Sequence, residues 1–486
     1  MNRFYAPYNF IPATGTVNDK PTPLCAVADW PAQAKAARHD VWQEGCYSGN
    51  FLCRVTTESP MGVGAEQKPR GGKDRAALRQ VTLYQRNGLP AIPASSLRGV
   101  VGSVLEAMSQ SALRVLDKRD DMTRSEGLHT PKIPVRGSVF ASLTSIAPHL
   151  VPFDSARSGL TPAECLLGVV SEDVRTQFQA LTSRLQFNDA LCVTAGHCYP
   201  DEILQIMASP HAKSPAFYYN QKHGRAAAKM RFQLDPNDPD AVFPNGRKVY
   251  LHQSKQFLRE HWKEHPLAAT KNDKQRTRVS LVREGEVFAF QLQFSNLSGA
   301  ELRLLIESLQ PSTFYRHRVG LGKPLGLGRI NLEIVGLEVE DRSQHYQQNA
   351  KEIERFRLNE IPLTTQASER FKHVLARLPA SMNLNLDQLK AMFADTSLID
   401  ETSRKRMLLI GNPAGVDASD VPTVYPRTPN QLAQWRDRSW AQANEGLFNW
   451  FTQNGNPNAV PKHQLKPIKV GSFLPSFPSN PHDPIQ

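Results

Sequence analysis

The sequence predicts an α+β fold in which an antiparallel sheet carries two helices on one face. Two observations support this prediction. A strand followed by an amphipathic helix occupies residues 50–115, and a strand, a helix, a glycine-rich loop and another strand occupy residues 286–338. Two such halves form a ferredoxin-like βαββαβ unit. We therefore expect a core built from residues 46–115 and 280–340.

The first half begins with a strand at Asn50–Glu58, where apolar and polar residues alternate. The helix that follows has Ser95 or Ser96 as its predicted N-cap. Its apolar residues recur at the spacing of one helical face, which predicts that this face packs on a core. These residues are Leu97, Val100, Val101, Val104, Leu105 and Met108.

The second half begins with alternating apolar residues at Val287–Phe294, which predict a half-buried strand. Ser298 and Glu301 have the spacing of a capping box and predict the start of a helix. After the glycine-rich loop, alternation at Ile330, Leu332 and Ile334 predicts the last strand of the core.

Residues 116–279 separate the two halves, and their many prolines and charges predict a large insertion. Within it, short strands are expected at Ser138–Leu143, Leu166–Val170 and Arg184–Thr194.

Both ends of the chain are rich in proline, asparagine and glutamine, so we expect irregular peripheral structure there. Residues 1–45 are interpreted as an N-terminal peripheral segment. Residues 341–486 are interpreted as a C-terminal extension that is partly helical and ends in an irregular tail.

The chain of 486 residues has 58 Lys and Arg against 46 Asp and Glu, a formal net charge of +12. A polyanionic partner fits this charge, although a basic protein without such a partner has the same composition. No run of about 18 apolar residues occurs, so we expect no membrane partner. No secretory signal is visible, and six cysteines are too few for a disulfide framework, so we expect a cytoplasmic location.

The glycine-rich loop at 320–328 is the sharpest local motif. Its glycines allow backbone N–H groups to approach an anion, and the flanking residues 315–330 contain no acid. One interpretation is a clamp on a nucleic-acid backbone; the other is a tight connection whose glycines only permit turns. The candidate RNA contacts are Arg316, His317, Arg318, Gly320, Gly322, Lys323, Gly326 and Gly328.

A second basic tract, Lys213–Arg231, places aromatic residues among cations. Single-stranded RNA is bound in this way, because bases stack on rings while cations hold phosphates. Lys222 and Arg225 are the candidate RNA contacts. A solvated basic loop with buried tyrosines is the alternative.

Acidic residues are sparse in the polar loop at 62–79, where Asp74 lies between two basic residues and Glu66 is the other carboxylate. Such a carboxylate could hold Mg²⁺ at a scissile phosphate, or it could simply balance charge. Zinc is a further candidate cofactor, although the lack of Cys-x-x-Cys favours buried free thiols. Its candidate ligands are Cys165, Cys192, His197 and Cys198.

Several motifs occur in a characteristic order. A strand ends in TTESP at residues 56–60, IPASSLRG at 92–99 opens a helix, and HRVGLGKPLGLG closes the core at 317–328. With RLQFNDA at 184–190 and FYAPYNFIP at 4–12, they resemble the RAMP superfamily of CRISPR-associated proteins. The resemblance covers roughly residues 1–340 and is closest to the backbone subunits of type III effector complexes.

The resemblance implies an RRM-like core that packs along a CRISPR RNA, with other effector subunits as partners. It also implies that the insertion supplies a thumb that separates segments of the guide–target duplex. In that family the start of the motif helix contacts guide RNA. The corresponding residues here are Ser95, Ser96, Arg98 and Gly99.

In catalytic members of the family, a loop aspartate supports Mg²⁺-dependent cleavage of target RNA. This role would fall to Asp74, with Glu66 as the substitute. Two alternatives remain open. One is a metal-free endoribonuclease that processes CRISPR RNA, with His317 as general base. The other is a structural assembly subunit that does not cleave RNA.

Overall fold

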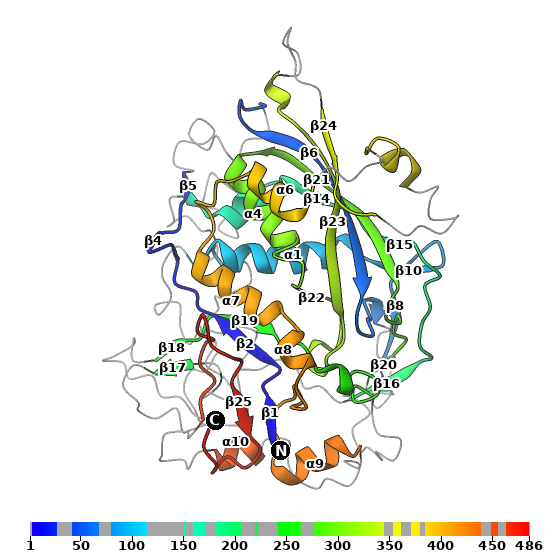
Figure 1. The fold of residues 1–486 in the computed structure, drawn as a ribbon, viewed down its shortest axis with the longest axis vertical. Coiled ribbons are helices and arrows are strands. Elements are labelled where there is room, and N and C mark those ends of the chain that lie inside the picture. Colours follow the sequence, from blue (N-terminus) through cyan, green and yellow to red (C-terminus); the bar gives the residue numbers. More distant parts are fainter. Residues whose placement is uncertain are drawn as a thin grey trace.

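The computed structural model confirms the predicted α+β class and its antiparallel sheet (Figure 1). The residues that it describes are 2–26, 41–67, 79–113, 150, 153, 159–170, 180–205, 217, 219–221, 242–263, 277–344, 353–360, 371–379, 384–438, 449–454 and 463–485.

The main sheet has nine antiparallel strands, and β6 lies at its centre between β21 and β23. On one side, β22 and β24 pair with β23; on the other, β14 and β15 pair with β21, followed by β10 and β9. Their bounds are β6 Tyr47–Thr57, β9 Gln85–Arg86, β10 Leu89–Ile92, β14 Leu185–Phe187, β15 Ala190–Cys192, β21 Val287–Leu297, β22 His317–Arg318, β23 Arg329–Glu340 and β24 Glu354–Arg357.

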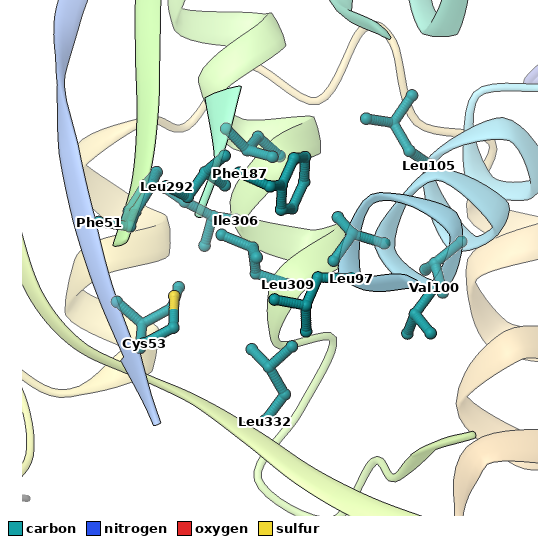
Figure 2. Packing of buried hydrophobic residues seen from close by; sticks show 14 of the residues in the cluster. Phe51, Cys53, Leu97, Val100, Leu105, Phe187, Leu292, Ile306, Leu309 and Leu332 are labelled. Carbon is teal, nitrogen blue, oxygen red and sulfur yellow. The ribbon is translucent and has the colours of Figure 1, made fainter. Parts of the chain in front are cut away.

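Two helices, α1 Ala94–Met108 and α4 Gly299–Leu309, pack against each other and cover the sheet. Alternation turns Phe51 and Cys53 of β6 toward these helices, and both side chains are fully buried. Figure 2 shows their contact region with Leu97 of α1 and Leu309 of α4. The predicted strands and both predicted helices of the core are therefore confirmed.

The predicted cap of the first helix is wrong. The N-cap residue is Pro93, and neither Ser95 nor Ser96 caps the helix. Instead, the Ala94 N–H donates to a carboxylate oxygen of Asp189 at 2.9 Å. A side chain distant in sequence thus replaces the local cap, and local spacing could not predict it.

Leu166–Val170 is not one strand, as predicted, but the end of helix α2 (Pro162–Leu167) followed by β12 (Val169–Val170). A capping box of Thr161 and Glu164 starts this helix, and Gly168 ends it at φ 76°. The predicted strand at Ser138–Leu143 lies outside the described residues.

Part of the predicted insertion belongs to the main sheet. Strands β14 and β15 fall within residues 116–279, yet both pair with β21. A smaller sheet of β7 Gly64–Gln67, β8 Arg79–Leu83, β16 Glu202–Leu204 and β20 Thr277–Val279 joins the loop after β6 to this region.

The two ends of the chain fold together. Strand β1 (Arg3–Tyr5) pairs with β25 (Ser476–Pro478), and β2 (Tyr8–Ile11) pairs with β19 (Arg247–Tyr250). Phe4 lies 5.6 Å from Trp450 between ring centroids, in an aromatic cluster separate from the main core. Residues 4–11 are therefore mostly buried, and apolar packing explains the regular strands there.

The C-terminal helices add a further layer. Figure 1 shows α6 (Leu386–Met392) and α7 (Glu401–Gly411) beside α4 and α1. The remaining helices and strands are β3 Thr16–Val17, β4 Lys20–Pro21, β5 Cys25–Ala26, β11 Gly159–Leu160, β13 Ala180–Leu181, β17 Tyr219–Gln221, β18 Val242–Pro244, α8 Ala414–Asp417, α9 Pro429–Arg436 and α10 Asn449–Gln453. None of the helices in the described ranges has the length and apolar character needed to cross a bilayer.

Candidate functional site

The glycine-rich loop is bound tightly to the segment that follows β6. The Gly328 N–H donates to the Pro60 carbonyl at 2.9 Å, and the Leu321 N–H donates to the Gly62 carbonyl at 2.8 Å. All four glycines of the motif have positive φ, between 67° and 94°. Several backbone groups of the loop are thus already bonded within the protein, as expected of a tight connection.

Two side chains of this loop are directed into the protein. His317 is 3% exposed and its Nε2 lies 2.8 Å from the Leu309 carbonyl. Burial lowers the pKa of His317 to about 4. Arg318 donates to the carbonyls of Leu251 and Lys323, and burial lowers its pKa to about 9. In this arrangement His317 has almost no surface on which to meet a substrate.

Two neighbouring arginines are also paired with protein groups. Arg316 pairs with Glu58 at 2.6 Å, and the buried Arg329 forms two hydrogen bonds to Asp417. Lys323 is half-buried, and burial with the nearby Arg318 charge lowers its pKa. The predicted RNA clamp at these residues stays a prediction, and Arg316 and Arg329 are bonded to protein carboxylates.

The start of α1 is held by Asp189. One carboxylate oxygen accepts the Ala94 N–H, while the other accepts from the Tyr84 hydroxyl at 2.6 Å and from Arg86 Nε at 2.7 Å. Burial raises the pKa of Asp189, but hydrogen bonds from Tyr84, Ala94 and Arg86 outweigh it and lower the pKa overall. The ionised carboxylate therefore complements the positive end of the helix.

Asp189 positions the predicted guide contacts. Ser95 and Gly99 are exposed on the first turns of α1, and Ser96 is half-buried beside them. The Arg98 guanidinium donates to the Leu167 carbonyl at the end of α2. Sequence analysis did not identify Asp189 as a site residue, although RLQFNDA at 184–190 contains it.

A histidine that faces solvent lies close to the end of β6. His197 has a side chain that is 67% exposed, and its Nδ1 is 2.7 Å from Glu286. Glu286 also accepts from the Thr194 hydroxyl and from the N–H groups of Gly196 and His197. Burial raises the Glu286 pKa, but these hydrogen bonds outweigh it and lower the pKa overall. An Nδ1–H bonded to this carboxylate leaves Nε2 as the proton acceptor.

An arginine accompanies this histidine. The His197 carbonyl accepts the Arg283 N–H at 2.9 Å, and Cys198 forms an antiparallel bridge with Val282. His197 and Arg283 are therefore directly opposed, and their side chains leave on the same face. The Thr57 hydroxyl at the end of β6 donates to the Arg283 carbonyl at 2.7 Å. An oriented base thus lies beside the loop after β6, and the Arg283 guanidinium lies over the Tyr199 ring, 5.1 Å from its centroid.

The four predicted zinc ligands are divided between two places. Cys165 is buried in α2, where a hydrogen bond with Cys25 and burial raise its pKa. Cys192 and Cys198 lie near Glu286 and His197, with the Cys192 sulfur 3.9 Å from Glu286. In the described part of the chain, no three His, Cys, Asp or Glu residues come together as a metal site.

Three predicted site residues, Asp74, Lys222 and Arg225, lie outside the described residues. Glu66 belongs to β7, whose backbone alone is described there. Their predicted roles remain predictions.

Comparison with known proteins extends this description. The family model of the RAMP superfamily matches residues 54–331, which is more than half of the 486-residue chain. A crystal structure of Thermofilum pendens Csc2 is similar at 13% identity and TM-score 0.31, covering 77% of this chain and 91% of that one. A type IV-B CRISPR complex chain is similar at 11% identity and TM-score 0.27, covering 66% and 98%. No curated protein matches. The matched segment runs from β6 to the start of β23.

Proposed function

This chain belongs to the RAMP superfamily of CRISPR-associated proteins, and from that premise we propose that it binds CRISPR RNA as a backbone subunit of a type III effector complex. The family match over residues 54–331 carries the proposal, because it includes the motif helix and the glycine-rich loop. The order β6, α1, β14 and β15, β21, α4, β23 supports a ferredoxin-like core, with β6 between β23 and β21.

The guide RNA contacts the start of α1 in this proposal. Ser95 and Gly99 are exposed there, and no atom lies within 4 Å of a Cβ built on Gly99. The Ser95 hydroxyl and the open backbone at Gly99 suit phosphate. The N–H groups of Ser96 and Leu97 already donate to the Pro93 carbonyl. Asp189 already accepts the Ala94 N–H, so the RNA contacts would come from the residues that follow Ala94 in α1.

Co-purification tests this proposal. The chain is co-expressed with its neighbouring genes and a repeat array, and the bound RNA is sequenced. Bound RNA should share a uniform 5′ end derived from the repeat. A Gly99→Glu variant should retain several-fold less RNA, since the new charge repels phosphate. Gly299→Glu is the matched control, because it also places a glutamate at a helix glycine with open space around it. Random host RNA, or equal loss in both variants, would contradict guide binding at α1.

Cleavage of target RNA is assigned to Asp74 with Mg²⁺, which would polarise the scissile phosphate. The assembled complex with a labelled target RNA should cleave it, and both EDTA and Asp74→Ala should abolish cleavage. Glu66→Ala tests the substitute carboxylate in the same assay. Unchanged cleavage in both variants would place the reaction in another subunit and favour a purely structural role.

Metal-free processing of CRISPR RNA is the second candidate, favoured by the solvent-facing His197 on its buried carboxylate. His197 Nε2 would take the proton of a ribose 2′-hydroxyl. The 2′-oxygen would then bond to the adjacent phosphorus, the bond to the 5′-oxygen would break, and that oxygen would take a proton from water. The product is a 2′,3′-cyclic phosphate.

His197→Ala should slow an EDTA-resistant cleavage of repeat RNA by roughly 10²–10⁴-fold, the usual contribution of a positioned base. His482→Ala is the control, because His482 is also exposed. Chemical analysis of the 3′ ends measures the cyclic phosphate. Cleavage that survives His197→Ala, or that stops with EDTA, would exclude this base.

A further inference from the structure

A cavity of about 500 Å³ lies where the core meets the C-terminal helices. Its walls come from α4, the turn after α4, α6 and α7, which are close together in Figure 1. This volume falls in the range of small-molecule sites, roughly 300–1,000 Å³. Its lining combines cations, hydroxyls and apolar groups: Arg303, Pro311, Ser312, Thr313, Phe314, Leu386, Asp387, Lys390, Ala391, Arg404 and Leu408.

Three cations in this wall share one fully buried carboxylate. Glu307 lies 3.0 Å from Arg303, 2.9 Å from Lys390 and 3.3 Å from Arg404. Because a single carboxylate neutralises one positive charge, the group keeps a positive excess. Such an excess in a partly desolvated site favours an anion.

The hydrogen bonds distinguish the three cations. Arg303 donates to the carbonyls of Lys390 and Phe393, so it fixes the end of α6. Lys390 donates to Glu307 and to the Pro311 carbonyl, and burial lowers its pKa. Arg404 is 25% exposed, and its other partner is Glu401 at 3.3 Å. Arg404 is therefore the cation best placed to meet a ligand.

Two acids lie near these cations, Asp387 in the cavity lining and Glu401 beside Arg404. Asp387 is exposed on the first turn of α6, and Glu401 also lies 3.7 Å from Lys405. Glu401 is 47% exposed, so solvent screens its interaction with Arg404. These acids moderate the positive excess, but both are exposed to solvent, which screens them, whereas Glu307 is the one carboxylate buried among the three cations.

An aromatic ring completes the cavity. Phe314 is 47% exposed, and Ser312 and Thr313 place hydroxyls beside it. A half-exposed ring can stack a nucleobase, a contact worth roughly 1–3 kcal/mol in nucleic-acid complexes. We propose that this cavity binds a nucleotide, with its phosphate at Arg404 and its base against Phe314. The same chemistry is offered by a free nucleotide and by the phosphorylated end of an RNA.

Equilibrium dialysis of the full-length chain tests the proposal with AMP, adenosine, and a short RNA with or without a 5′-phosphate. AMP, the phosphorylated RNA or both should bind, and adenosine should bind at least roughly tenfold more weakly because it lacks the charged partner of Arg404. AMP binding indicates a free nucleotide as the source. Binding of the phosphorylated RNA alone indicates an RNA end.

Arg404→Gln and Phe314→Ala should each weaken binding by roughly tenfold. Lys405→Gln is the matched control: its side chain is 54% exposed on the same helix, outside the cavity lining, and it should leave binding unchanged. Phe314→Ala removes a half-exposed ring, so folding should survive it, and thermal unfolding checks this. No binding up to about 1 mM, equal binding of adenosine and AMP, or binding insensitive to both variants would overturn the proposal. Guide-RNA retention is measured in a separate experiment. The proposal of nucleotide binding and the proposal of guide-RNA binding can therefore be rejected independently.

Discussion

Replacing Arg184 with alanine should lower the free energy of unfolding by about 3–5 kcal/mol, the range for breaking a buried ion pair. The Arg184 side chain is fully buried and pairs with Glu301, which is 7% exposed. It also donates to the carbonyls of Cys165 at 3.1 Å and Asn296 at 2.9 Å. The guanidinium thus joins α2, the strand β21 and the capping box of α4. Its loss leaves the Glu301 carboxylate buried without its cation.

Denaturant unfolding followed by circular dichroism measures this effect. Arg86→Ala is the control, because Arg86 is 57% exposed in its pair with Asp189. It should leave the stability almost unchanged, because an exposed ion pair contributes little. If Arg184→Ala were as mild as the control, the buried pair would not hold these elements together.

Replacing Gly328 with alanine should destabilise the protein by roughly 3 kcal/mol or more, through backbone strain and steric overlap. Gly328 has φ +77°, and a Cβ built on it would lie 1.8 Å from the Val319 carbonyl oxygen. Because that atom belongs to the backbone, a side-chain movement cannot relieve the overlap. The glycine is therefore required by the fold, whether or not RNA contacts the loop.

Gly99→Ala is the matched comparison, because no atom lies within 4 Å of the position of its Cβ. In the middle of α1, alanine should raise stability by about 0.5–1 kcal/mol. Thermal unfolding of the two variants separates the roles of these glycines. A Gly328→Ala variant as stable as the parent protein would show that the loop can adopt another path.

The periodic patterns predicted most of the core. Alternation in β6 and β21 and the apolar stripe of α1 identified elements that the structure confirms, since each signal is local in sequence. The capping box at Ser298 was also correct, because it too spans a few residues. The predicted cap of α1 was wrong because Asp189 binds there from a distant part of the sequence. The predicted strand at Leu166–Val170 was wrong because its pattern is short and does not distinguish a strand from the end of a helix.

The roles of the charged residues depended on contacts distant in sequence. His317 and Arg318 are residue types that commonly bind anions. In the folded protein, however, their side chains form hydrogen bonds with backbone carbonyls. His197 was considered only as a zinc ligand, and it lies 89 residues from the Glu286 that orients it. His317 is buried and His197 is exposed because the surrounding residues pack differently around each. Local sequence patterns do not encode that packing.

The amino-acid pattern alone was enough to predict the fold class, the elements of the core and, through the order of its motifs, the superfamily that the family model confirms. These follow from local periodicity and from short motifs. The folded structure was needed to show that β14 and β15 belong to the main sheet, that the two ends of the chain pair, and that a cationic cavity lies between α4, α6 and α7. The physical reason is that strand pairing and burial join residues far apart in the chain, and they depend on which surfaces the folded protein brings together.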